Sequence, residues 1–344
     1  MIAIDLFSGA GGMSLGAVHA GVEILTAVEK DTQACATFKH NFPRVNLFED
    51  DIRNFTPPSL PSSESVVFGG PPCQGFSTSN QRTRNKQNPD NWMFKEFFRV
   101  VEQTEPEWVV FENVRGLLET EKGFFWDLII NQLNILGYVT SFAALNSAFF
   151  GIPQVRNRLF IVGNRKGRKF IFPTANYEQV TVAEAISDLP DIDNGASTSW
   201  LPYAHVATSK YAEMLRGNLK GCANNIATNS SAHIVERYKH VPQGGNWEDI
   251  PIALMQNYKD RTRCHTGIYH RLRSDAPSVV LGNFRKNMLI HPEKDRGLSV
   301  REVARLQSFP DSFEFCGSIG FQQQQVGNAV PPKLAEEIFR QLQQ

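Results

Sequence analysis

The sequence predicts an α/β protein with a doubly wound, mostly parallel sheet, followed by a second, smaller, loop-rich domain. Two observations lead to this fold class. In the first half, short apolar segments alternate with amphipathic ones, which is the pattern of strands and helices that follow one another along the chain. From about Phe172 this regularity fades, and residues 173–270 are rich in Asn, Ser, Gly and Pro. Irregular loops of that length are uncommon inside one compact domain, which favours a second domain.

The first half contains apolar segments that we expect to form buried strands, because they end in glycine or polar residues. Helical spacing between them predicts helices, and Asp31 is well placed to cap the second of these. The expected strands cover residues 2–7, 23–29, 45–48, 65–70, 107–113, 138–150 and 158–164, and the expected helices cover 11–20, 31–42, 92–103 and 124–137.

The helical pattern returns after Ser299, in "SVREVARLQSF". The final segment, "GNAVPPKLAEEIFRQLQQ", predicts a capped terminal helix with two prolines at its start. We therefore expect a first domain over residues 1–178 and 296–344, to which the C-terminal helix returns, and a second domain over residues 179–295.

The composition is that of a globular protein with a sizeable core: 344 residues, 41% of them hydrophobic. Met1 leads directly into "IAIDLF", and no segment approaches the roughly 20 apolar residues of a membrane span. We therefore expect a soluble, cytoplasmic protein without a membrane partner. The five cysteines are scattered and form no C-x-x-C pair, which supports neither a disulfide framework nor a zinc site.

The formal charge is zero, with 35 basic and 35 acidic residues, but the basic residues gather in a few segments. Residues 156–169 hold six basic residues and no acid, and residues 81–88 hold three with none. Residues 261–273 add four arginines and two histidines. Such segments suit a surface that binds along the phosphates of a nucleic acid. A run of charged residues is, however, more often ordinary solvated surface.

A glycine-rich turn, "DLFSGAGGMSLG", follows the first expected strand. Gly9 and Gly11 allow a tight turn and close approach to a ligand at a helix N-terminus. Ser14 stands where a dinucleotide fingerprint has its third glycine, so a ligand with a carboxylate fits at least as well as a pyrophosphate. Glu29 ends the second strand, 18 residues after Gly11, where an acid can accept hydrogen bonds from ribose hydroxyls. Taken alone, the glycines could serve close packing, and Glu29 could be an ordinary charge at the end of a strand. Together they indicate a nucleoside-containing cofactor.

Cys73 lies in "VVFGGPPCQGFS" at the end of the fourth expected strand. The first and fourth strands of a doubly wound sheet commonly lie side by side, so this turn and the glycine-rich turn would open into one crevice. A free thiol has a pKa of about 8.5 and needs a cationic neighbour to act as a nucleophile at neutral pH. Arg156 and Arg158 of "QVRNR" share one face of a strand and could supply it. The alternatives are a space-filling cysteine and a plain surface arginine pair.

Glu112 of "FENV" ends the strand that we expect beside that of Cys73. A partly desolvated carboxyl at this place would have a raised pKa and could share or donate a proton. The alternative is a strand-end acid held by a helix N-terminus.

In this order, these segments resemble the motifs of the 5-cytosine DNA methyltransferases. "DLFSGAGG" looks like the family's first cofactor motif, "GGPPCQGFS" its nucleophile motif, "ENV" its acid motif and "QVRNR" its arginine motif. "QVGNAVPP", residues 325–332, is similar to its closing motif. The match covers most of residues 1–170 and 268–335. "RLRSDAPSVVL" resembles the ninth motif, with Val279 and Val280 where a threonine is usual.

The resemblance implies a Rossmann-like S-adenosylmethionine-dependent sheet with a target-recognition domain, and S-adenosylmethionine as methyl donor without a metal. Cys73 would attack carbon 6 of a cytosine flipped out of DNA, while Glu112 hydrogen-bonds ring nitrogen 3. Arg156 and Arg158 would hold the thiolate and the base, and Asn113 would support the site. By the same resemblance, the cofactor residues are Phe7, Gly9, Gly11, Glu29, Asp51, Ile52, Pro72 and Asn328.

We therefore predict a DNA (cytosine-5-)-methyltransferase that acts as a monomer on a specific double-stranded sequence in a prokaryotic or phage-infected cell, associated with the nucleoid. It would be the modification enzyme of a restriction-modification system, with a separately encoded endonuclease as partner. One alternative is a tRNA cytosine-5 methyltransferase, although the Cys-Phe-Thr segment of that branch is absent here. The other is a catalytically silent DNA-binding module, against which the intact Cys73, Glu112 and arginine pair argue.

Overall fold

The computed structural model describes residues 1–72, 88–175, 178–258, 266–282 and 284–344. The chain divides into two compact units. The first comprises Met1–Ser147, Arg156–Ala175 and Val330–Gln344, and the second comprises Ala148–Val155 and Asn176–Ala329.

The first unit is built on a seven-stranded sheet in the described part of the chain, with strand order β3-β2-β1-β4-β5-β7-β6. Neighbours from β3 to β5 are parallel, and β7 is antiparallel to both β5 and β6. The predicted α/β class with a mostly parallel sheet is therefore confirmed. The strands are β1 (Ile2–Leu6), β2 (Glu23–Val28), β3 (Asn46–Phe48), β4 (Ser65–Gly69), β5 (Trp108–Asn113), β6 (Val139–Asn146) and β7 (Asn157–Asn164).

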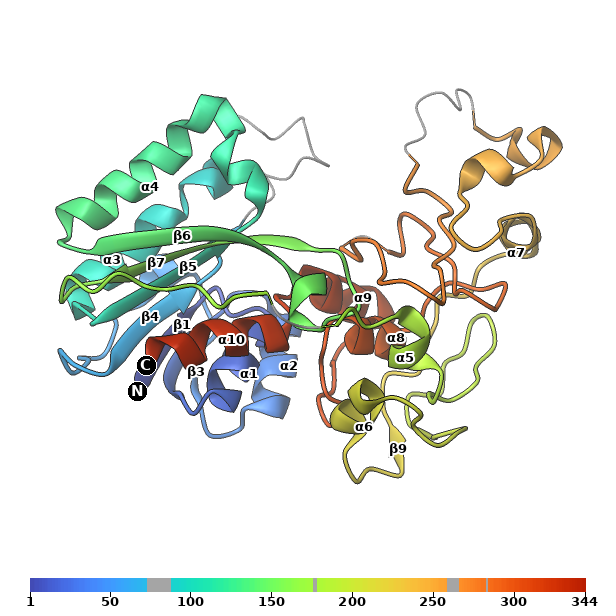
Figure 1. The fold of residues 1–344 in the computed structure, drawn as a ribbon, viewed down its shortest axis with the longest axis horizontal. Coiled ribbons are helices and arrows are strands. Elements are labelled where there is room, and N and C mark those ends of the chain that lie inside the picture. Colours follow the sequence, from blue (N-terminus) through green and yellow to red (C-terminus); the bar gives the residue numbers. More distant parts are fainter. Residues whose placement is uncertain (73–87, 176–177, 259–265, 283) are drawn as a thin grey trace. The chain divides into compact units, whose positions relative to one another are not determined.

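Helices cover both faces of this sheet, with α3 and α4 on one face and α1, α2 and α10 on the other (Figure 1). Asp31 caps α2 as predicted, because its Oδ1 accepts hydrogen bonds from the backbone N–H groups of Gln33 and Ala34, each at 2.9 Å. The helices of this unit are α1 (Gly12–His19), α2 (Thr32–Asn41), α3 (Phe94–Thr104), α4 (Phe124–Ile135) and α10 (Pro332–Leu342).

The C-terminal helix packs against the first helix of the chain. A Cβ atom at Gly16 of α1 would lie 2.4 Å from the carbonyl oxygen of Pro332, so only glycine permits this approach. Phe339 of α10 meets Phe68 of β4 edge to face, with ring centroids 4.8 Å apart. The last helix thereby packs against β4.

The second unit consists mainly of short helices joined by loops. Thr181 and Ser299 open α5 and α8 with capping boxes. Its helices are α5 (Val182–Ile186), α6 (Lys210–Arg216), α7 (Ala232–Lys239), α8 (Val300–Leu306) and α9 (Ile319–Asn328), and its strands are β8 (Leu201–Pro202) and β9 (Gly221–Cys222). None of the helices in the described ranges is both long and apolar enough to cross a membrane.

Two features differ from the sequence-based expectations. The strand expected over residues 138–150 ends at Asn146, because Ser147 turns away and its N–H and Oγ both donate to the Arg156 carbonyl. The helix α9 was not predicted, since its "QQQQ" segment has no clear apolar face. Short 3-10 helices cover Ile52–Asn54, Pro89–Trp92, Arg115–Leu118, Thr120–Gly123, Ser147–Phe150, Trp247–Asp249 and Ile252–Met255.

Candidate active site

The glycine-rich turn after β1 and the acid after β2 are in direct contact. Gly9 N–H donates to Glu29 Oε2 at 2.8 Å, and Glu29 Oε1 accepts from the N–H groups of Lys30 and Asp31 at 2.9 and 2.8 Å. Phe7 has a φ of 60°, which is strained for a residue with a side chain and is typical of functional turns. The structure thus brings together three of the predicted cofactor residues.

Two observations show that this turn fits a polar ligand. A Cβ atom at Gly9 would meet no atom within 4 Å, so space is open beside its backbone. Next to it, the buried Ser8 hydroxyl has no hydrogen-bond partner among the described residues. A buried hydroxyl without a partner costs free energy that a ligand can recover. At Gly11 a Cβ atom would lie 2.5 Å from the Phe42 ring, so a glycine there also permits close packing.

Asp51 and Ile52 follow β3. Asp51 accepts from Arg53 through both carboxylate oxygens, at 2.9 and 2.7 Å, and also caps the short helix that begins at Ile52. The hydrogen bonds from Arg53 lower the pKa of Asp51 to about 2, so it is ionised at neutral pH. The buried Ile52 offers its carbonyl to Arg99 at 2.7 Å.

The turn after β4 is shaped by an acid of the neighbouring strand. A Cβ atom at Gly70 would lie 2.6 Å from Glu112 Oε2, so only glycine leaves room for this carboxylate. Pro71 is buried and Pro72 is partly exposed. Cys73, the predicted nucleophile, lies outside the described residues.

Glu112 forms a buried ion pair with Arg158. The Oε1 to Nε distance is 2.8 Å, and each side chain is 11% exposed. Burial raises the pKa of Glu112 above its ordinary value, while the positive charges of Arg158 and Arg156 oppose this rise. Burial outweighs the two positive charges, so the net direction of the Glu112 pKa is upward.

The two arginines are not a surface pair. Arg156 is only 1% exposed, and Arg158 is bound to the Glu112 carboxylate. The backbone at Arg156 is held by Ser147, whose N–H donates to its carbonyl at 2.9 Å. The plain surface interpretation of "QVRNR" is therefore wrong.

Asn113 supports the turn that precedes Cys73. Its Nδ2 donates to the Pro71 carbonyl at 3.3 Å, and its Oδ1 accepts from Val114 N–H at 2.9 Å. Asn328, the remaining predicted residue, is the last residue of α9 in the second unit.

Sequence reasoning missed a buried acid close to this turn. Asp5 of β1 is 1% exposed and accepts from Ser14 Oγ at 2.5 Å. Burial raises the pKa of Asp5 well above its usual range, against the effect of the Ser14 hydrogen bond. An acid inside the apolar run "IAIDLF" is the sequence signal that could have identified it.

The described residues hold no group of three or more His, Cys, Asp or Glu side chains arranged to bind a metal ion.

Comparisons with known proteins agree on one kind of relative. A family model described as C-5 cytosine-specific DNA methylase matches residues 1–344. Type II methyltransferase M1.HphI of Haemophilus parahaemolyticus is 39% identical over 343 residues, which cover 97% of this chain and 84% of that protein. Type II methyltransferase M.DdeI of Desulfomicrobium norvegicum is 32% identical over 366 residues, covering 98% and 88%.

Among solved structures, this chain is similar to a DNA modification methyltransferase encoded within an E. coli prophage. The TM-score is 0.79 at 27% identity, and the match covers 100% of this chain and 98% of that one. The similarity thus extends over both compact units.

Proposed function

Because the chain belongs to the C-5 cytosine-specific DNA methylase family, we propose that it is the modification enzyme of a restriction-modification system, with Cys73 as its nucleophile. It is a DNA (cytosine-5-)-methyltransferase. The observation that carries the proposed chemistry is the buried Glu112–Arg158 pair, which lies against Gly70, three residues before Cys73. A catalytically silent module gains no support from this arrangement.

We assign the cofactor pocket to the turns that follow β1, β2, β3 and β4. When bound, S-adenosylmethionine supplies an electrophilic methyl group. Glu29 would accept hydrogen bonds from ribose hydroxyls, and the unpaired Ser8 hydroxyl and the open space at Gly9 suit a polar ligand at this turn. The full set assigned to the cofactor is Phe7, Gly9, Gly11, Glu29, Asp51, Ile52, Pro72 and Asn328.

The reaction at the base uses a covalent adduct. Cys73 Sγ attacks carbon 6 of the cytosine, and Glu112 holds a proton at ring nitrogen 3, so that negative charge does not accumulate on the ring. Carbon 5 thereby becomes nucleophilic enough to accept a methyl group. Loss of the carbon 5 proton and departure of Cys73 then restore the ring and the free thiolate.

The other side chains position these groups. Arg158 orients the Glu112 carboxylate, and the buried Arg156 adds positive charge nearby. Asn113 anchors Pro71, which precedes the nucleophile by two residues. Fixed groups of this kind reduce the reorganisation that the reaction requires.

The substrate is a cytosine within double-stranded DNA. A stacked base cannot be reached from either face, so it must be flipped out at a cost of a few kcal/mol. We assign residues 179–295 to target recognition and residues 1–178 and 296–344 to catalysis. We also propose that the enzyme acts as a monomer in the cytoplasm of a bacterium or phage-infected cell. Its partner endonuclease would be encoded separately.

Bisulfite sequencing tests this function. We would express the chain in a bacterial host that lacks cytosine-5 methylation and sequence its treated genome. Protected cytosines within one short sequence context are expected, and Cys73→Ala should abolish them while Cys316→Ala leaves them unchanged. Purified protein that methylates tRNA but no DNA, or equal protection with Cys73→Ala, would contradict the proposal.

A further inference from the structure

The second unit contains a cavity of about 270 Å³, lined by residues of α7, of α9 and of the loop over residues 284–289. Ligand pockets in proteins typically measure about 300–1,000 Å³, so this cavity has room for one small molecule. All of its described lining residues belong to the second unit. None of them has been assigned to catalysis or to S-adenosylmethionine.

The interior of the cavity is apolar and partly aromatic. The buried residues that line it, each 2–3% exposed, are Tyr238, Phe284, Leu289 and Leu298. Aromatic and apolar walls of this kind bind flat rings well, because every nucleobase has an apolar face that can stack. The interior therefore suits a planar ring such as a nucleobase.

The rim of the cavity is polar, and none of its described lining residues is acidic. Its polar members, all exposed or partly exposed, are Thr228, Asn229, Ser230, Ser231 and Arg285. Hydroxyl, amide and guanidinium groups can all donate hydrogen bonds to an anionic oxygen. The rim thus differs in chemistry from the interior, and a ligand with both an apolar ring and an anionic group matches the two.

Arg285 has no counter-charge in the described part of the chain. A Cβ atom at Gly320 would lie 3.4 Å from its Nη1, so the guanidinium lies beside the first turn of α9. That turn contains no acid, and the side chain of Ser318 does not cap it. The partial positive charge at this end of the helix adds to the charge of Arg285. Together they favour an anionic ligand such as a phosphate.

Gln323 of α9 adds an unsatisfied acceptor at the wall of the cavity. It is 4% exposed, and its Nε2 donates to Thr228 Oγ1 at 2.9 Å. Its Oε1 has no hydrogen-bond partner among the described residues. A buried acceptor without a partner costs free energy that a donor on a ligand can recover. Amino groups of nucleobases are donors of this kind.

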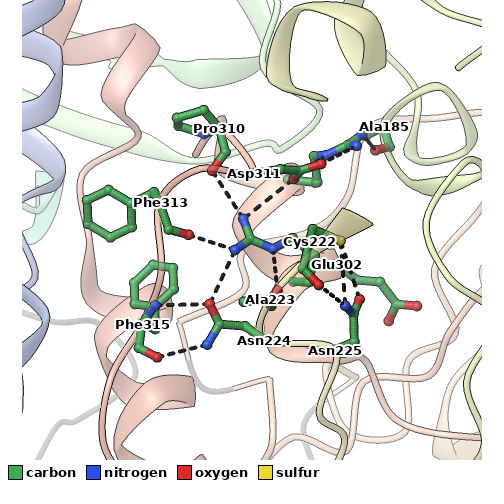
Figure 2. Close-up of polar contacts among 12 residues, drawn as sticks. Ala185, Cys222, Ala223, Asn224, Asn225, Glu302, Pro310, Asp311, Phe313 and Phe315 are labelled. Atoms are coloured by element: carbon green, nitrogen blue, oxygen red, sulfur yellow. Dashed lines mark hydrogen bonds and ion pairs between the residues drawn. The ribbon is translucent and has the colours of Figure 1, made fainter. Parts of the chain in front are cut away.

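Hydrogen bonds from two asparagines fix the walls of the cavity. Asn194 holds the backbone of Ser230 from both sides, with Nδ2 donating to its carbonyl at 2.8 Å and Oδ1 accepting from its N–H at 3.1 Å. Asn224 holds α9, because its Nδ2 donates to Gln322 Oε1 at 2.9 Å. Figure 2 shows Asn224 bonded to the Phe315 backbone, which precedes this helix. A preformed site loses less freedom when a ligand binds.

We propose that this cavity binds a nucleoside monophosphate. The base lies against the apolar interior, the phosphate lies at Arg285, and a donor of the nucleoside bonds to Gln323 Oε1. This inference goes beyond the proposed function, since the site is separate from the residues assigned to methyl transfer. A free nucleotide and a nucleotide displaced from a DNA strand present the same groups, and experiment can separate these two sources.

Titration calorimetry with the four deoxynucleoside monophosphates tests the site in the full chain. Saturating S-adenosylhomocysteine keeps these nucleotides out of the cofactor pocket. At least one should bind, and Arg285→Gln should weaken its binding about tenfold, since a charge-assisted hydrogen bond is lost. Lys286→Gln removes the same charge one position along, outside the cavity lining, and should leave affinity unchanged. Absence of binding by all four nucleotides, or equal affinities in the two variants, would overturn the proposal.

Gln323→Met tests the contact of the nucleoside. Methionine keeps the length and removes the acceptor, so nucleotide binding should weaken about fivefold while binding of inorganic phosphate stays unchanged. Gln325→Met is the matched control, because Gln325 lies two positions along α9, on its opposite side, and donates to the Cys316 carbonyl at 3.2 Å. It should lower the melting temperature about as much and leave nucleotide binding intact. Equal weakening by both variants, or phosphate that binds as tightly as the nucleotides, would contradict a nucleotide site.

Two DNA duplexes of the same sequence, one with a single bulged nucleotide, separate the two sources. If a displaced DNA nucleotide is the ligand, the bulged duplex binds more tightly, and Arg285→Gln removes this difference while Lys286→Gln keeps it. If a free nucleotide is the ligand, both duplexes bind equally well and a saturating mononucleotide changes neither affinity. A preference for the bulged duplex that persists in Arg285→Gln, without any binding of mononucleotides, overturns the proposal.

Discussion

Glu112 of β5 and Arg158 of β7 form an ion pair with an Oε1 to Nε distance of 2.8 Å inside the first unit. The strands are antiparallel neighbours, and Glu112 lies opposite Phe160, so Arg158 approaches it diagonally from the same face. A guanidinium stays protonated at neutral pH. Arg158 can therefore orient the carboxylate without competing for its proton.

Glu112→Gln should lower methyl transfer by about 10²- to 10⁴-fold, because the amide cannot supply an acid proton to the base. Transfer of a labelled methyl group to DNA measures this loss. Glu107→Gln is the control, since Glu107 is a buried acid that directly precedes β5 and is paired with Lys166 and Arg168. It should lower stability but leave kcat of the folded enzyme within about threefold. Equal losses of kcat in both variants would contradict a catalytic role for Glu112.

Arg158→Gln should shift the pH profile of the enzyme. Burial raises the pKa of Glu112 and Arg158 opposes this rise, so removing the guanidinium raises that pKa further. Activity that depends on the protonated carboxyl is lost as the pH rises through this pKa, and the loss should move to higher pH in the variant. A profile of kcat/KM against pH measures the shift. Arg165→Gln, which removes the ion pair with Glu105, should leave the profile in place. A downward shift in Arg158→Gln would refute the assignment.

Gly70→Ala should impair catalysis more than folding. The added methyl group would displace Glu112 Oε2, from which it would otherwise lie 2.6 Å away. Displacing a catalytic group by about 1 Å can cost about 10²-fold in rate. Steady-state kinetics and thermal melting check both effects. Gly297→Ala, whose new methyl would meet only ordinary contacts, is the control, and unchanged kcat in Gly70→Ala would count against this close approach.

Glu29→Gln should weaken binding of S-adenosylhomocysteine by about tenfold, because a charged acceptor for ribose hydroxyls is lost. Calorimetry measures the change directly. Glu49→Gln, which removes an acid paired with Lys39 on the surface, should bind as the unchanged enzyme does. Equal affinities for all three proteins would exclude Glu29 from the cofactor pocket.

Much of the first unit could be predicted from local patterns. The strands from β1 to β5, the cap at Asp31 and the C-terminal helix after Pro331 depend on periodicity and capping within a few residues. The order of the motifs indicated the family, and the glycine-rich turn and the acid after β2 together indicated a nucleoside-containing cofactor. The structure places the Gly9 N–H 2.8 Å from Glu29 Oε2.

The sequence by itself determined the α/β class, the order of the strands and helices in the first unit, and the identity of the family. Only the tertiary structure decided that Gly70 leaves room for the Glu112 carboxylate and that Arg158 binds it. The same is true of the hydrogen bond from Asn224 to Gln322 of α9. Local patterns fix secondary structure because they act between neighbours in the chain. These contacts join residues that are tens of positions apart, and they form only when packing brings their strands and helices together.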